Sequence, residues 1–277
     1  LAPAAIGSDT GGSVRIPAAW NDLVGLKTTA GRLSLKGILP LAESFDTMGP
    51  LTRTVEDAAL MLSLLEGSRP ADLAGATLSG ARFLVLETLA FDGIAEVPAR
   101  SFEAAVDRLA AAGARIARGP VPEVADAMPF GAPLYTAEAW GYWREVIESD
   151  PGKVFPPILE RFRSGGTVAA ADIVAAWNRL RALREGYRAA TSAYDAVILP
   201  TVASLPPEAA RLLADREAYT TENRLALRNT TLGNLMGVSA LTLPTGTPSC
   251  GLMLMAAPFA EERLLRLGAA AEKALRA

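Results

Sequence analysis

A glycine-flanked serine in a short polar segment is the feature of this sequence best suited to covalent chemistry. Residues 7–15 read Gly-Ser-Asp-Thr-Gly-Gly-Ser-Val-Arg, and the 277-residue sequence contains no histidine. Ser13 therefore has the setting of a nucleophile, but a Ser-His-Asp triad cannot activate it. A serine nucleophile without histidine needs another kind of base, and lysine is the first candidate.

The same segment is suited to hold the negative charge that acyl transfer creates. Glycine has no Cβ, so the backbone at Gly11 and Gly12 can approach a ligand closely. Successive N–H groups in such a turn form an anion-binding concavity, which is what an oxyanion hole requires. The candidate donors are the backbone amides of Thr10, Gly11, Gly12 and Ser13.

Two opposite charges flank this loop. Asp9 and Arg15 are expected to pair across it and hold it rigid. In the alternative, Arg15 binds a carboxylate of the substrate; we favour the pair.

Other interpretations of the segment are a polar linker, a phosphate-binding loop and a nucleophile elbow. Gly7 and Gly12 have the spacing of a G-x-x-x-x-G-K-[ST] loop, but Ser13 stands where that motif needs lysine. The G-x-S-x-G elbow does not fit, because Arg15 replaces its last glycine and no histidine is present. The loop by itself supports catalysis and an ordinary polar loop about equally.

The following residues extend the pattern. In order, they are 13–19 (SVRIPAA), 24–29 (VGLKTT), 31–34 (GRLS), 37–40 (GILP), 44–50 (SFDTMGP) and 53–59 (RTVEDAA). Weaker matches are 234–238 (NLMGV), 243–246 (LPTG) and 251–254 (GLML). This ordered set closely resembles the amidase signature family, densely over residues 3–66.

The resemblance implies an α/β fold, with a mixed central β-sheet flanked by helices on both sides, and one amidase-type domain over residues 1–277. It implies hydrolysis of a small carboxamide to carboxylate and ammonia through a serine acyl-enzyme. Ser13 would attack the carbonyl, and the amides of the loop from Thr10 to Ser13 would form the oxyanion hole. In that family a second serine, in a cis peptide linkage, relays the proton to a neutral lysine.

The family's lysine and relay serine lie N-terminal to the loop, whereas Ser13 has only twelve residues before it. None of Lys27, Lys36, Lys153 and Lys273 matches the family's lysine. We therefore expect an N-terminally truncated portion of an amidase with one of three triad members and little or no turnover by itself. Lys27, the nearest, is expected at a strand end with its stem packed and its head in water.

Composition excludes several classes of protein. The net charge of −3 predicts no nucleic-acid partner, since such proteins carry a basic face. The lone Cys250 excludes an internal disulfide and fits a reducing, cytoplasmic compartment; we expect it to be a small packing residue. No histidine and one cysteine argue against a zinc site, and no cofactor is indicated. No apolar run reaches the ~18–20 residues of a membrane span.

Hydrophobic periodicity and punctuation predict alternating strands and helices. Strands are expected at 82–87, 114–117, 197–199, 241–243 and 252–255, and helices at 54–67, 102–113, 134–149, 167–193, 217–236 and 260–276. Residues 82–117 then form a strand–helix–strand unit with parallel strands. Residues 68–80 are expected to be a linker, and residues 46–50 a turn near the site.

Aromatic side chains gather in the predicted helix 134–149, at Tyr135, Trp140, Tyr142 and Trp143. We favour a core stripe for them by about two to one over a wall for an acyl group, since aromatics commonly fill cores.

Three functions remain open. The first is a stand-alone amidase, which we favour. The second is the amidase subunit of a glutamine-dependent tRNA amidotransferase, from the same family. The third is an inactive fragment that acts at most as a binding module. In that case an exposed sheet edge would promote association, and a homodimer is expected.

Overall fold

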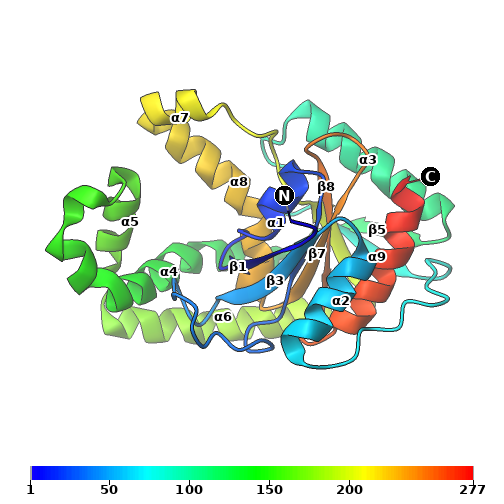
Figure 1. Ribbon diagram of the computed structural model, residues 1–277, viewed down its shortest axis with the longest axis horizontal. Coiled ribbons are helices and arrows are strands. Elements are labelled where there is room, and N and C mark those ends of the chain that lie inside the picture. The colour runs from blue at the N-terminus through cyan, green and yellow to red at the C-terminus, as the bar shows by residue number, and fades with distance from the viewer. Residues whose placement is uncertain (1, 277) are drawn as a thin grey trace.

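A computed structural model describes residues 2–276, which form an eight-stranded mixed sheet between two layers of helices (Figure 1). The strands are β1 (Ala5–Asp9), β2 (Val24–Lys27), β3 (Thr47–Thr52), β4 (Arg82–Leu86), β5 (Arg115–Gly119), β6 (Ala196–Pro200), β7 (Ser239–Pro244) and β8 (Gly251–Ala256). They lie in the order β1-β3-β2-β7-β8-β6-β4-β5. Pairing is antiparallel from β1 to β6 and parallel from β6 to β5. The mixed sheet expected from the sequence is confirmed.

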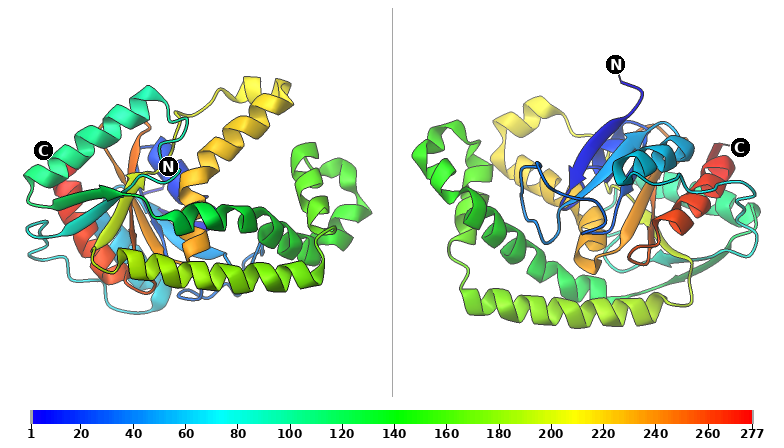
Figure 2. Two further views of the ribbon diagram at one scale, coloured as in Figure 1. Left: turned by 180° about the vertical axis from the view of Figure 1, so that it is seen from behind. Right: turned by 60° about the horizontal axis from the view of Figure 1, so that its bottom comes forward.

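Helices cover both faces of the sheet (Figure 2). They are α1 (Arg15–Trp20), α2 (Val55–Glu66), α3 (Glu96–Ala111), α4 (Pro122–Ser149), α5 (Pro156–Gly165), α6 (Ala170–Thr191), α7 (Ala209–Ala214), α8 (Arg216–Met236) and α9 (Glu261–Arg276). One apolar core lies between the sheet and helices α2, α3 and α9, and a second between the sheet and helices α4, α6 and α8. A two-faced α/β sheet requires two such cores, because each strand points alternate side chains to opposite faces.

The helix predicted at 54–67 forms as α2. The Thr54 hydroxyl accepts a hydrogen bond from the Asp57 amide at 3.0 Å, and Gly67 ends the helix in the left-handed region at φ 67°. This is an N-cap at one end of the helix and a glycine C-cap at the other, and the sequence predicted both. The predicted strand–helix–strand unit also forms, as β4, α3 and β5 with parallel pairing.

Two predictions of local structure were wrong. Helix α4 begins at Pro122, twelve residues before the predicted start, and contains Pro129 and Pro133. Prolines normally interrupt helices, but burial of Val124 and Ala127 against α6 and α8 favours the longer helix. Residues 46–50 do not form a turn alone, because β3 begins at Thr47.

Close strand approach explains the second error. A Cβ on Gly49 would lie 1.8 Å from the carbonyl oxygen of Leu26, so only glycine allows β3 to lie this near β2. Strand pairing on both sides of β3 overrides the local turn signal. It also brings the C-terminal ends of β1 and β2 and the N-terminal ends of β3 and β7 to the same end of the sheet, since neighbours among them are antiparallel.

Candidate active site

The loop that carries Ser13 connects the end of β1 to the start of α1 and lies against the last turns of α8. The six candidate residues all lie within residues 9–15 and stay together. Asp9, Thr10 and Arg15 are buried, whereas Ser13 is exposed at the surface of the loop. The fold therefore presents the serine to solvent and buries the groups that hold its loop.

The predicted pair between Asp9 and Arg15 is present and fully buried. Arg15 Nε donates to Asp9 Oδ2 at 2.9 Å, and Arg15 Nη2 donates to Asp9 Oδ1 at 2.8 Å, which is a bidentate arrangement. Burial by itself would raise the pKa of Asp9, but the charge and hydrogen bonds of Arg15 outweigh it and lower that pKa. Arg15 has no exposed surface for a substrate carboxylate.

Three polar residues of α8 complete the support of the loop. The Thr230 hydroxyl donates to the Gly11 carbonyl at 2.6 Å, and the Thr231 hydroxyl donates to the same oxygen at 3.3 Å. Asn234 Nδ2 donates to Asp9 Oδ1 at 3.0 Å. Sequence analysis missed these roles. The available signal was a group of polar residues in an otherwise apolar helical end, since buried polar groups need partners.

Gly12 is required by both its conformation and its surroundings. Its φ is +143°, and a Cβ at this position would lie 2.1 Å from the Thr230 hydroxyl oxygen. Contact with α8 therefore demands glycine here, as expected from close backbone approach.

The backbone amides of Gly11, Gly12 and Ser13 make no hydrogen bond to any group within residues 2–276. The Ser13 hydroxyl likewise has no partner in this part of the chain. Free donors beside an unengaged hydroxyl are what a ligand-binding nest offers. The loop thus combines a buried ion pair beneath it with an exposed Ser13 and backbone amides that have no partner within residues 2–276.

Thr10 ties this loop to the segment before β3. Its hydroxyl donates to Asp46 Oδ1, and Asp46 Oδ2 accepts hydrogen bonds from the amides of Leu41 at 2.8 Å and Ala42 at 3.1 Å. The Thr47 hydroxyl donates to the Asp9 carbonyl at 3.0 Å. Residues 46–50 therefore lie beside the site, as the sequence suggested.

The aromatic residues of α4 are mostly engaged by neighbouring elements. Tyr135 packs edge-on against Phe45 with ring centres 4.5 Å apart. Trp143 Nε1 donates to the Pro40 carbonyl at 2.6 Å, and the Tyr142 hydroxyl donates to Glu43. Of the four aromatic side chains expected to form a stripe, only Tyr135 packs against the apolar core and Tyr142 is 46% exposed, so the core stripe expected from the sequence forms only in part.

The expectation for Lys27 was wrong. Its side chain is 1% exposed, and Nζ donates to the carbonyls of Thr28 at 2.9 Å and Val238 at 2.8 Å. Burial and the nearby charge of Arg15 lower its pKa to about 7. The error arose because a strand-end lysine normally reaches water, whereas α8 covers this end of β2. Its amine does not contact Ser13 in the described part of the chain.

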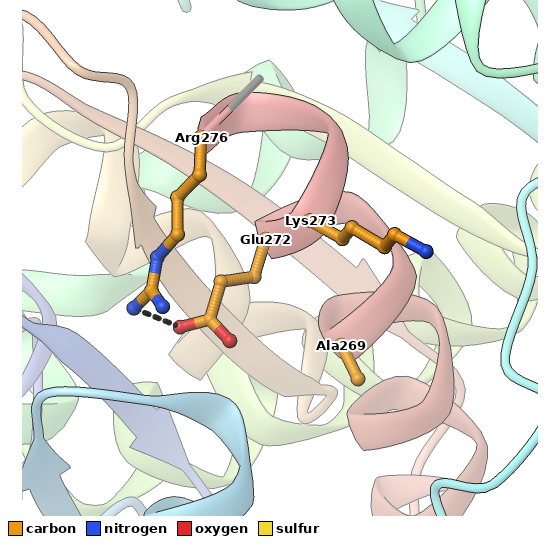
Figure 3. A pocket seen from close by; sticks show the side chains of 4 residues that line it. All are labelled: Ala269, Glu272, Lys273 and Arg276. Atoms are coloured by element: carbon orange, nitrogen blue, oxygen red, sulfur yellow. Dashed lines mark hydrogen bonds and ion pairs between the residues drawn. The ribbon is translucent and has the colours of Figure 1, made fainter.

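A surface hollow on the outer side of α9 is separate from this site (Figure 3). It is lined by Ala269, Glu272, Lys273 and Arg276. Glu272 pairs with Arg276 at 2.9 Å and accepts a hydrogen bond from the Val55 amide at 3.2 Å, at the start of α2. This hollow therefore reflects a contact that joins two helices.

Within residues 2–276, no group of three or more His, Cys, Asp or Glu side chains is placed to hold a metal ion. Over the same residues, every helix is too short or too polar to cross a membrane.

Comparison with known proteins agrees with the fold and the loop. The model of the family described as Amidase matches residues 1–265. The chain belongs to this amidase family.

Individual relatives come from several kinds of amidase-family protein. The chain is 36% identical over 270 residues to a 2-amino-5-chloromuconic acid deaminase of Comamonas testosteroni, covering 94% of this chain and 58% of the relative. It is 34% identical to an amidase of Pseudomonas putida, covering 98% and 62%. A crystal structure of an amidase superposes with a TM-score of 0.85 at 28% identity, covering 98% and 62%. The chain thus spans about 60% of the length of these relatives.

Proposed function

We propose that this chain carries the nucleophile and oxyanion hole of an amidase that hydrolyses a small carboxamide to a carboxylate and ammonia. Ser13 is the nucleophile, and the backbone amides of Thr10, Gly11, Gly12 and Ser13 bind the developing oxyanion. Asp9 and Arg15 are positioning residues that hold the loop. The observation that carries the proposal is an exposed, unengaged serine beside free amides on a loop braced by a buried bidentate ion pair.

The reaction would follow from these positions. Ser13 Oγ attacks the carbonyl carbon of the amide and gives its proton to a base, and the carbonyl oxygen becomes an oxyanion that the loop amides bind. The C–N bond then breaks, and the nitrogen takes a proton and leaves as ammonia. Water attacks the resulting ester, which releases the carboxylate and restores Ser13. The base is the relay serine and neutral lysine that the family resemblance implies.

The relatives support a small nitrogen-bearing substrate. One is named for deamination of 2-amino-5-chloromuconic acid and another is named an amidase. The proposal also retains a homodimer and a cytoplasmic location as expectations. For the chain as a separate fragment, strand β1, which lies at the edge of the sheet and exposes Ile6, is the element on which a homodimer would form.

The proposal is tested by treating the protein, as its gene encodes it, with a fluorophosphonate. Intact mass and peptide mapping should place one label on Ser13. The Ser13→Ala variant should lose the label and the hydrolysis of small carboxamides by about 10⁴-fold or more. Its unfolding should match wild type, since Ser13 is exposed and its hydroxyl has no hydrogen-bond partner within residues 2–276. A folded wild-type protein that takes up no label would contradict the proposal.

A second candidate is the A subunit of a glutamyl-tRNA(Gln) amidotransferase. A segment of 72 residues is 54% identical to such a subunit of Persephonella marina. Over nearly the whole chain, however, subunits of this kind are 27–31% identical, which is lower than the two relatives above. Glutaminase activity that appears only with a second subunit would favour this candidate over a stand-alone amidase.

A further inference from the structure

We propose that Lys27 is a positioning residue for the Ser13 loop: its buried amine fastens the end of α8 to the end of β2, and its charge state sets how firmly Asp9 and Arg15 brace the loop. The catalytic part of this inference rests on the proposed function above. The part concerning loop rigidity stands on the contacts alone.

The first observation is the set of partners around the amine. Lys27 is the last residue of β2, and its register partner Ala240 belongs to the core beneath α8. Nζ therefore points away from the face of Leu26 and donates to the carbonyls of Thr28 and Val238. These two acceptors match the two N–H bonds of a neutral amine. An ammonium ion has three donors, and the third has no acceptor within residues 2–276.

The second observation is the path from this amine to the loop. Val238 follows the left-handed Gly237 cap of α8, and its own amide donates to the Gly233 carbonyl at 3.1 Å. Holding Val238 therefore holds the last turns of α8. Those turns carry Thr230, which donates to the Gly11 carbonyl, and Asn234, which donates to Asp9. A shift of this helical end is passed directly to the loop.

The third observation is the balance of charge around Lys27. The charges that act on its amine are those of Asp9 on β1, Arg15 on α1, Arg184 on α6 and Glu261 on α9. Burial and Arg15 disfavour the charged form, and the pKa of Lys27 lies at about 7. The amine therefore changes charge across neutral pH, which an exposed lysine does not do.

The consequence follows from Coulomb's law in a buried setting. A protonated Lys27 repels the Arg15 guanidinium and attracts the Asp9 carboxylate, so it competes with their bidentate pair. A neutral Lys27 keeps both carbonyl contacts without this competition. The loop should thus be held most firmly above about pH 7, where the amine is uncharged.

The charge change is measurable directly, because substitution of Lys27 assigns its signal. In protein labelled with lysine ¹³C at Cε, the resonance that disappears in Lys27→Met should titrate near neutral pH. The exposed Lys36→Met is the matched control and should leave this resonance and its titration unchanged. If the resonance that Lys27→Met removes titrates only above about pH 10, as an ordinary lysine does, the proposal is overturned.

The positioning role is tested by the pH profile of Ser13 labelling from about pH 5.5 to about 9. The labelling rate of wild type and of Lys36→Met should rise through neutral pH. In Lys27→Met and Lys27→Gln this rise should be about fivefold smaller. A merely structural lysine would lower the rate at every pH without changing the shape of the profile. Variant profiles that superimpose on wild type after scaling would therefore overturn the proposal.

Hydrogen–deuterium exchange separates failure of this inference from failure of the proposed function. A peptide over residues 9–20 contains the Ile16 amide, which donates to the Gly12 carbonyl at 2.8 Å. After correction for intrinsic rates, its protection should rise from pH 6 to about pH 8 in wild type and stay constant in Lys27→Met. Protection that changes as expected in a protein that takes up no label refutes the amidase proposal alone. Protection that is equal in both proteins at every pH refutes the role of Lys27.

Discussion

Two arginines of this molecule, the buried Arg15 and the partly buried Arg32, sit in opposite balances of charge. Arg15 lies behind the Ser13 loop and pairs with one carboxylate, Asp9, in a region that also contains Lys27 and Arg184. Positively charged side chains outnumber carboxylates in this region, and neither Arg15 nor Asp9 is exposed to water. Loss of the one carboxylate would leave several positive groups facing one another.

Arg32 has the reverse arrangement. Its guanidinium lies between the carboxylates of Glu66, Glu261 and Glu262, which join the end of α2 to the start of α9. The pKa of Arg32 is raised because the hydrogen bonds that it donates to these carboxylates outweigh its burial. Two of the three carboxylates reach water, at 18% and 57% exposure of their side chains.

A charge cluster is most sensitive to the loss of one partner where solvent cannot reach it. Solvent can screen the Arg32 cluster, so one partner can be lost without leaving every other charge unpaired. The Arg15 cluster has no such screening, and its removal leaves uncompensated buried charge. The fold places the sensitive cluster under the loop with the candidate nucleophile and uses the tolerant one to join two helices.

The largest effect is expected for Asp9→Asn. This change leaves Arg15 buried without its carboxylate and should cost about 3–5 kcal/mol of unfolding free energy. Ser13 labelling should also be lost. Urea unfolding and labelling measure both, with Glu66→Gln in the other cluster as the control. An Asp9→Asn protein that labels at the wild-type rate would contradict the bracing role.

Gly12→Ala should have the second-largest effect. The added Cβ would lie 2.1 Å from the Thr230 hydroxyl oxygen, so the loop must shift. Its amide N–H groups would then no longer point at the oxyanion. A misplaced oxyanion donor typically costs about 10²–10³-fold, and Ser13 labelling should fall by that amount. Gly31→Ala is the matched control beside Arg32, because Gly31 also has positive φ but no neighbour within 4 Å of its Cβ position. Equal labelling by the two variants would refute steric demand at Gly12.

The ionisation of Lys27 should have an effect of intermediate size, visible in how the unfolding free energy depends on pH. Its pKa is lowered from 10.5 to about 7 in the folded chain, so the unfolded chain binds the extra proton between these values. Stability should therefore rise with pH over this window, by about 2–3 kcal/mol between about pH 7.5 and about 9.5. Urea midpoints should reveal the rise in wild type and its loss in Lys27→Met. A rise of equal size in both proteins would assign it to other groups.

Arg32→Met should have the smallest effect of the four. It leaves the fully buried Glu261 with the Thr29 amide as its remaining partner, which donates at 2.6 Å. A loss of about 2 kcal/mol is expected, because solvent can reach the other two carboxylates. Ser13 labelling of the folded variant should match wild type. A large loss of labelling would mean that the two clusters are coupled through the sheet.

Several features were predictable from local sequence. Thr54 and Gly67 marked both ends of α2, and buried apolar runs marked β4 and β6. The Ser13 loop and the Asp9–Arg15 pair were predictable because the partners lie six residues apart, so a single loop brings them together. The order of the motifs indicated the family.

Other features depended on contacts between distant residues. Helix α4 continues through Pro129 because its neighbours bury it, and residues 47–52 form β3 because strands flank them on both sides. Thr230 and Asn234 lie more than 200 residues from the loop that they support. Neither relation has a local signature.

Residue types and their spacing alone specify the available chemistry: a serine without histidine, glycine amides, and two opposite charges within one loop. Packing between distant elements sets which of those groups is exposed and which is buried. Ser13 faces solvent, while Asp9 and Arg15 lie beneath α8. Lys27 illustrates the reason most clearly. Its type and strand position predict a solvated ammonium, but the helix packed over β2 removes water from its amine, and desolvation is a property of the packed chain.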